Sequence, residues 1–228
     1  MDKRKHYILI LDTETVNGHS DEKGRLDFSD VFAYDIGYCI VDTRGKVYLE
    51  RSFINSDIFF FEKDLMRSAY YANKIPQYLE DLTEGKRLCA NTAQIRKKML
   101  ADMQEYNVKE VCAHNARFDI VALNNTQRYT TKSRFRYWFP YGTKVWDSML
   151  MARSVIHKKP TYAKFVDENN LRTATGKLPT SAETLYKFIE KNPAFVESHT
   201  GLEDVQIERE IVKYCYRQKK QMRKVLYE

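Results

Sequence analysis

The chain has 228 residues, of which 43% are hydrophobic and 30% are charged, and its formal net charge is +7. This composition excludes an intrinsically disordered chain, and the length suits one well-buried core, so we expect a single domain over residues 1–228. No apolar run is long enough to span a bilayer, and Asp12 and Glu14 interrupt the first apolar run too soon for a signal peptide. We therefore expect a soluble, cytoplasmic protein without a membrane partner, whose positive charge favours a polyanionic one.

The N-terminal part of the chain predicts an antiparallel meander. Apolar-rich stretches predict strands over residues 7–11, 31–41 and 46–54. A short polar segment that ends in Gly45 separates the last two strands, as a hairpin turn does. Residues 21–30 are expected to form a loop.

The middle of the chain alternates helices with short strands. Helical patterns cover residues 62–71, 75–82 and 92–106. Short strands are predicted over residues 108–113 and 144–146. Asn115 is expected to cap a helix over residues 116–124, and Asp147 or Ser148 is expected to cap a helix that reaches Ile156.

The C-terminal third is less regular. Residues 158–180 are polar, with Pro near both ends, and predict either a hairpin insertion or a mobile loop. Ser181 begins another helix, and Thr200 with Glu203 has the spacing of a capping box that opens a last helix to about Leu226. Strands followed by alternating strands and helices indicate an α/β fold, in which helices flank a mixed sheet.

Four cysteines, Cys39, Cys89, Cys112 and Cys215, are scattered along the chain without a CxxC pair. This pattern favours buried, reduced thiols over disulfides or a zinc site.

A first acidic motif comes directly after the first predicted strand. Alternate side chains of a strand share a face, so Asp12 and Glu14 point the same way while Thr13 points opposite. Two neighbouring carboxylates repel each other unless a cation lies between them. The alternative is a strand that simply ends in solvent.

Two further motifs place carboxylates at the start of helices. Asp119 falls in the first turn of the helix after a strand, where ligands of α/β sheets collect, although an ordinary capped helix is the alternative. Asp204 lies in the first turns of the last helix, and His199 precedes it. A rigid carboxylate beside a movable proton acceptor suits hydrolysis. His114 is read as structural, and helix capping accounts for Asp147.

Together, these motifs resemble those of the DEDDh exonucleases, the DnaQ-like branch of the RNase H-like superfamily. Residues 7–15, 114–119 and 199–205 are similar to the first, second and third motifs of that family, and residues 145–153 are similar to the segment between the last two. The chain departs from the family pattern at the delayed Gly18, near residues 55–80 and within 126–142. These departures affect the choice of substrate rather than the chemistry.

The resemblance implies an RNase H-like mixed sheet and a metal-dependent 3′→5′ exonuclease that releases nucleoside 5′-monophosphates by a two-metal-ion mechanism. Asp12 would bridge both ions, Glu14 and Asp204 would complete one site, and Asp119 would hold the other. Hard oxygen ligands favour Mg²⁺ or Mn²⁺ over zinc. His199 would accept a proton from the attacking water.

Substrate contacts are expected in segments inserted near residues 55–80 and 126–180. Arginines and aromatics alternate over residues 133–141, as in a grip on single strands, although a hydrophobic plug over the sheet is the alternative. The aromatic clusters at 59–61 and 70–71 leave open the same choice between a wedge against a base and core packing. The predicted contacts are Thr13, Thr15, Asn115, Phe118, Arg134, Arg136, Tyr137 and Trp138.

Analogy favours DNA, with single-stranded or frayed 3′ ends, over RNA as the nucleic acid partner. An exoribonuclease or oligoribonuclease is the first alternative. A catalytically inactive nucleic-acid-binding relic is the second, but relics tend to lose one of the carboxylates or the histidine that are all present here. Residues 1–228 contain no polymerase module, so a proofreading role would need a polymerase partner.

Overall fold

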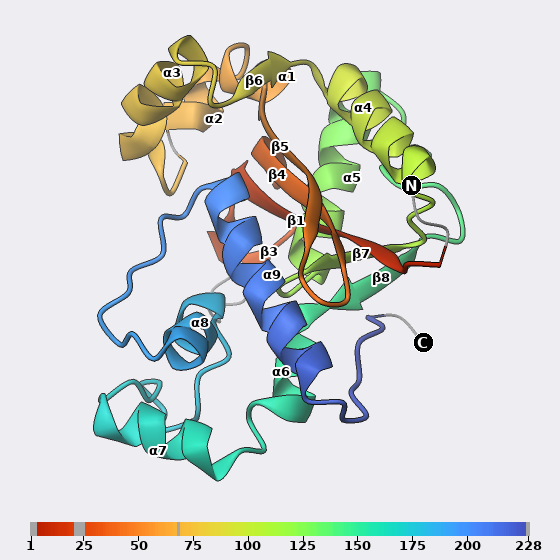
Figure 1. Cartoon of the computed structure of the whole chain (residues 1–228). Coiled ribbons are helices and arrows are strands. Elements are labelled where there is room, and N and C mark those ends of the chain that lie inside the picture. The colour runs from red at the N-terminus through yellow and green to blue at the C-terminus, as the bar shows by residue number, and fades with distance from the viewer. Residues whose placement is uncertain (1–3, 21–25, 68, 227–228) are drawn as a thin grey trace.

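The computed structural model describes residues 4–20, 26–67 and 69–226 (Figure 1). Its strands are β1 (Tyr7–Val16), β2 (His19–Ser20), β3 (Leu26–Asp27), β4 (Phe32–Asp42), β5 (Val47–Asn55), β6 (Leu88–Ala90), β7 (Glu110–Ala113) and β8 (Lys144–Asp147). Its helices are α1 (Ser56–Phe59), α2 (Lys63–Arg67), η1 (Ala72–Lys74), α3 (Ile75–Thr83), α4 (Thr92–Glu105), α5 (Arg117–Thr131), α6 (Ser148–Val155), α7 (Pro160–Glu168), α8 (Ala182–Glu190) and α9 (Gly201–Arg217).

Six strands form one mixed sheet in the order β6-β5-β4-β1-β7-β8. β1, β4 and β5 are successive antiparallel neighbours, and β7 and β8 run parallel to β1, which confirms the predicted meander followed by parallel strands. β6, which was not predicted, pairs parallel with β5. β2 and β3 form a separate two-stranded sheet, so the predicted loop is wrong for Leu26–Asp27, while residues 21–25 lie outside the described part of the chain.

Helices cover both faces of the sheet because β1 is apolar on both (Figure 1). Tyr7, Leu9 and Leu11 pack in a cluster with α4 and α5. Ile8 and Ile10 point the other way, into a cluster with α6, α7, α8 and α9. A mixed sheet between two helical layers is the α/β fold that the sequence predicted, and β1 is its central strand.

The predicted insertion near residues 55–80 packs as a third cluster. α1, α2 and α3 lie together beyond the end of β5 (Figure 1). Ile58, Phe59 and Tyr78 are buried there against Tyr34 of β4. The helix predicted over 62–71 is wrong beyond Arg67, because α2 ends there and the chain reaches α3 through η1.

Three other expectations need correction. Asn115 does not cap α5: it has a φ of 63° in the left-handed region, and α5 begins two residues later without a side-chain cap and continues to Thr131. The hairpin or mobile loop expected over residues 158–180 is wrong for Pro160–Glu168, which form α7. Thr200 is the residue before α9, but its hydroxyl donates to Glu203 Oε2 (2.7 Å) instead of accepting a backbone N–H, and α9 ends at Arg217.

The predicted helix caps at Asp147 and Ser181 are confirmed, and the buried thiols are confirmed for three of the four cysteines. Asp147 caps α6 by accepting from the N–H of Met149 (2.8 Å), and Ser181 caps α8, as predicted. The cysteines are free thiols, three of them buried, whereas Cys89 is exposed. Among the described residues, no helix combines the length and the apolar character needed to cross a membrane.

Candidate metal centre

The first two site carboxylates lie within β1 rather than after it. Ile10 is the last residue of β1 paired with β7, opposite Cys112, and β1 continues to Val16. Asp12 and Glu14 therefore project beyond the carboxyl end of β7, where ligands of α/β sheets collect. They share the face of Ile8 and Ile10, the face that α9 covers.

The start of α9 lies against this face because two glycines meet there. Gly37 of β4 is the cross-strand partner of Asp12. A Cβ added to Gly37 would lie 2.3 Å from the carbonyl carbon of Gly201, so only glycine allows this approach of strand and helix. Asp204, in the first turn of α9, is thereby brought in front of the β1 carboxylates.

A buried ion network holds the same helix end. Asp35, the cross-strand partner of Glu14, accepts the N–H of Gly201 at 2.9 Å and an Arg87 N–H at 3.0 Å. Arg87 is 3% exposed and also binds Asp81 (3.0 Å) and Glu203 (2.8 Å). Burial raises the pKa of Asp35 to about 6, and the Arg87 charge opposes that rise. Asp35 and Arg87 were not among the predicted site residues, because no local sequence pattern joins them.

Asp12, Glu14 and Asp204 form a group of carboxylates that could hold one cation. One ligand oxygen from each lies within 4.8 Å of the other two. Burial and repulsion from Asp204 raise the pKa of Glu14 to about 9, and burial and repulsion from Glu197 raise the pKa of Asp204 to about 8. Burial raises the pKa of Asp12 well above its usual range. Asp204 Oδ1 is buried and has no hydrogen-bond partner among the residues that the structure describes. Buried, mutually repelling oxygens of this kind fit a hard divalent cation.

Asp119 lies at the side of this group. It is 2% exposed, and its Oδ1 accepts from the Thr13 N–H (3.1 Å) and the Thr13 hydroxyl (2.9 Å). Burial raises the pKa of Asp119 to about 7, while the bonds from Thr13 oppose that rise. Thr13, which was predicted to contact substrate, is 5% exposed and bonded to Asp119, so the prediction is wrong for its side chain. Thr13 instead orients the carboxylate of Asp119, whose charge helps to raise the pKa of Asp12.

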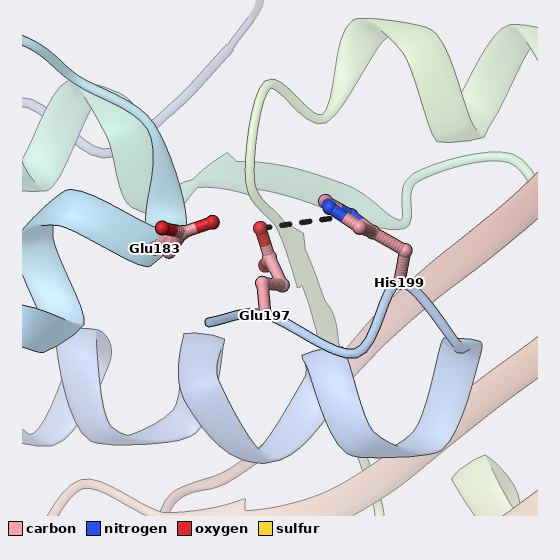
Figure 2. Close-up of side chains that lie close together, drawn as sticks. All are labelled: Glu183, Glu197 and His199. Atoms are coloured by element: carbon pink, nitrogen blue, oxygen red, sulfur yellow. Dashed lines mark ion pairs between the residues drawn. The ribbon is translucent and has the colours of Figure 1, made fainter. Parts of the chain in front are cut away.

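His199 stands at the entrance of α9, in a left-handed backbone conformation with a φ of 52°. Its Nδ1 lies 3.8 Å from Glu197 Oε2, and Glu183 of α8 points toward the same place (Figure 2). Lys74 donates from its Nζ to the His199 carbonyl at 2.9 Å. Burial and the Lys74 charge lower the pKa of His199, whereas burial beside Glu183 raises the pKa of Glu197 to about 7. A neutral imidazole beside a carboxylate can accept a proton near neutral pH.

His114 and Asp147, at the ends of β7 and β8, support the site through hydrogen bonds. The ring of His114 is held between the Ser148 hydroxyl (2.8 Å) and the Thr180 carbonyl (2.6 Å), in agreement with its predicted structural role. Asp147 Oδ1 accepts the Asn115 N–H at 3.2 Å in addition to capping α6. Asn115 is exposed, and Phe118 is half-buried beside the ring of Phe28.

Glu208 is a further buried carboxylate near the site and was not among the predicted site residues. It is 2% exposed, and its Oε1 accepts the N–H of His114 at 2.8 Å. It follows Asp204 by one helical turn on α9 and therefore shares its face. That spacing was the signal available in the sequence.

The aromatic and basic segment 133–141 follows α5 and folds back along it. The Trp138 N–H donates to Asn124 Oδ1 at 2.8 Å, and the Arg128 guanidinium lies 4.9 Å from the centre of the Tyr137 ring. Trp138 is fully buried and its Nε1 contacts Met99 Sδ, so its prediction as a substrate contact is wrong and the plug is correct for this residue. Arg134, Arg136 and Tyr137 are exposed.

The fold is similar to those of solved nuclease structures. No family model and no curated protein match the sequence. Among solved structures, the nuclease domain of 3′hExo, a DEDDh family member bound to rAMP, superposes with a TM-score of 0.52 at 13% identity, over 98% of each chain. E. coli exonuclease I in complex with a dT13 oligonucleotide superposes with a TM-score of 0.53 at 13% identity, over 92% of this chain and 41% of that one.

The chain has a DEDDh exonuclease-like fold. A zinc-bound exonuclease I–ssDNA complex from E. coli is also similar, with a TM-score of 0.51 at 12% identity. The chain spans about two fifths of exonuclease I, since it covers 40% and 41% of that protein in these two structures.

Proposed function

We propose that this chain is a metal-dependent 3′→5′ exonuclease that hydrolyses DNA from single-stranded or frayed 3′ ends and releases nucleoside 5′-monophosphates. One observation carries the proposal: oxygens of Asp12, Glu14 and Asp204 lie within 4.8 Å of one another, and His199 stands at the start of the helix that bears Asp204. Carboxylates that share a cation beside a neutral base are the parts that phosphodiester hydrolysis needs.

Two divalent ions, Mg²⁺ or Mn²⁺, would be held by these side chains. Glu14 and Asp204 would bind one ion and Asp119 the other, with Asp12 between them. When bound, such ions lower the pKa of a coordinated water and stabilise the leaving oxygen. The chain itself fixes the ligands: β1 is paired on both sides, and the Gly37–Gly201 contact sets the depth of Asp204.

His199 would remove the proton from the attacking water. Its lowered pKa keeps the imidazole neutral at neutral pH, so a ring nitrogen is free to accept. Glu197, close to Nδ1, would favour the tautomer with a proton on that atom and would stabilise the imidazolium that forms. Side-chain exposure of 38% leaves His199 accessible to a substrate.

The polyanionic substrate is supported by the net charge of +7. Thr15, Asn115 and Phe118 remain the proposed contacts close to the carboxylates. Arg134, Arg136 and Tyr137 are exposed on the segment that folds back along α5, and they are proposed to bind another part of the strand. Any polymerase partner would have to be a separate chain or segment.

A 3′→5′ exoribonuclease is the second candidate. The 3′hExo nuclease domain, which superposes over 98% of both chains, is bound to rAMP. The exonuclease I structures contain single-stranded DNA. An inactive nucleic-acid-binding relic is less favoured, because a relic has no need to keep four mutually repelling carboxylates buried.

Product analysis tests the proposal. Single-stranded DNA, duplex DNA and RNA, each labelled at the 5′ end, are incubated with the protein in Mg²⁺, in Mn²⁺ and in EDTA. We expect a ladder that shortens by single nucleotides from the 3′ end, only with metal, and most rapidly on single-stranded DNA. Faster shortening of RNA would favour the second candidate, and metal-independent cleavage would contradict both.

A further inference from the structure

Glu208 is buried among groups that give it no complete set of partners. Its Oε1 accepts the His114 N–H, but its Oε2 is a buried atom without a hydrogen-bond partner in the described part of the chain. A buried polar atom left in this state costs free energy, so a partner absent from the protein itself is expected.

The surroundings of Glu208 indicate which partner that is. The amide that anchors Oε1 belongs to His114, which directly follows β7, while Asp204 lies one turn earlier on the same face of α9. His114 lies between β7 and α5, the helix that bears Asp119. The bond from its N–H therefore holds the Glu208 carboxylate on the side of the metal centre where Asp119 lies.

A direct bond from Glu208 to the ion held by Asp12, Glu14 and Asp204 does not fit. One ligand oxygen from each of those three residues lies within 4.8 Å of the other two, and Glu208 is not part of that group. Mg²⁺ keeps several of its water ligands in proteins, and neighbouring carboxylates commonly hold such waters in place. A water ligand of an ion supplies a hydrogen-bond donor of the kind that Oε2 lacks.

We propose that Glu208 is a fifth carboxylate of the metal centre, which accepts a hydrogen bond from a water ligand of the ion beside Asp119. This inference rests on the proposed two-ion function. The competing state is a neutral carboxylic acid with a purely structural role. Glutamine has the shape of that acid and can still accept from His114, so Glu208→Gln separates the two states.

Calorimetric titration of the metal-free protein with Mn²⁺ provides the readout. We expect Glu208→Gln to weaken the affinity for one of two ions by about 10- to 100-fold, as loss of a partner of a metal ligand does elsewhere. Glu210→Gln is the matched control on the same helix, since Glu210 pairs with Arg209 and Lys213 instead. It should bind Mn²⁺ like the wild type.

Thermal unfolding shows whether each variant is folded. Without metal, Glu208→Gln should unfold at or above the temperature of the wild type, because one of several repelling buried carboxylates is gone. Addition of Mn²⁺ should raise the unfolding temperature of this variant by less than it raises that of the wild type. If Glu208→Gln does not fold, Glu208→Asp replaces it in the test, because this variant keeps the charge. We expect its Mn²⁺ affinity to lie between that predicted for Glu208→Gln and that of the wild type.

Wild-type Mn²⁺ affinity in folded Glu208→Gln would overturn the inference and would identify a neutral structural acid. Asp12→Ala separates this failure from failure of the proposed function. If the wild type degrades DNA and Asp12→Ala does not, while Glu208→Gln binds Mn²⁺ normally, only the role of Glu208 is lost. If the wild type neither binds Mn²⁺ nor shortens a strand, the proposed function fails with it.

Discussion

The ring of Tyr71 stacks on the imidazole of His199, with centroids 4.8 Å apart and planes inclined by 16°. Tyr71 comes from the segment between β5 and β6, whereas His199 leads into α9. Lys74 of the same segment donates to the His199 carbonyl. The stretch that departs from the family pattern thus supports the proposed base, in addition to any contact it makes with substrate.

Tyr71→Leu should lower kcat by about 2- to 10-fold with KM little changed, because an aromatic pair contributes about 0.5–1.5 kcal/mol to holding the imidazole. Tyr71→Phe keeps the stacked ring and is the control. Steady-state kinetics on single-stranded DNA measure both variants. Equal losses in the two would assign the effect to the hydroxyl group rather than to stacking.

Asp12→Ala should abolish hydrolysis, because its carboxylate is the one proposed to contact both ions. Binding of single-stranded DNA in Ca²⁺ should survive, since the basic surface is unchanged. Gel-shift and product assays on the same preparation measure the two properties. Turnover near that of the wild type would remove the two-metal assignment.

His199→Ala should lower the rate by about 10²- to 10⁴-fold with metal affinity little changed. The lowered pKa of His199 means that the wild type should keep its rate as pH falls to about 6.5 and lose it below, when the imidazole takes up a proton. That acidic limb should be missing from the profile of the variant. A limb that persists unaltered would assign the base to another group.

Metal-free protein should become less stable as pH rises from about 5 to about 9. The pKa values of Asp119, Asp204 and Glu14 are raised to about 7, 8 and 9 on folding, so the folded state binds more protons than the unfolded state in this window, and the free energy of unfolding falls with pH. Mn²⁺ competes with these protons, so its stabilising effect should grow over the same window.

Thermal unfolding in EDTA and in Mn²⁺ at several pH values measures this dependence. Glu14→Gln removes one of the raised groups and should flatten the slope of the metal-free protein. An identical slope in wild type and variant would show that groups outside the centre dominate.

Arg87→Met should destabilise the protein by about 3–5 kcal/mol, because it leaves Asp35 buried without its cation. Glu203→Gln removes the ion pair between Arg87 and Glu203, whose side chain is 51% exposed. This change should lower the free energy of unfolding by less than about 1 kcal/mol. Urea denaturation measures both. Similar losses would mean that the network acts through Glu203 and not through Asp35.

The parts of the site that sequence predicts are those set by local geometry. Asp12 and Glu14 share a face because strands alternate, and Asp119 and Asp204 lie in first turns of helices that were expected. Arg87 could not be found this way, since its partner Asp35 is 52 residues away and its burial comes from tertiary packing.

The wrong elements have identifiable causes. Asn115 is of a type that favours both helix caps and the left-handed region, and here the second preference prevails. α7 was missed because Pro160 marked a break, although Pro is common at the first helical position. Only Tyr162 and Val166 of α7 are fully buried, too few to give a periodic signal.

The contact between the backbones of Gly37 and Gly201 makes the geometry of the metal centre less sensitive to changes in core packing. Two backbones set the distance between strand and helix, so Asp204 does not depend on how side chains interlock in either core layer. Large-to-small changes in those layers should therefore reduce stability well before they alter the spacing of the carboxylates. In a library that varies both positions together, active clones should keep glycine at both.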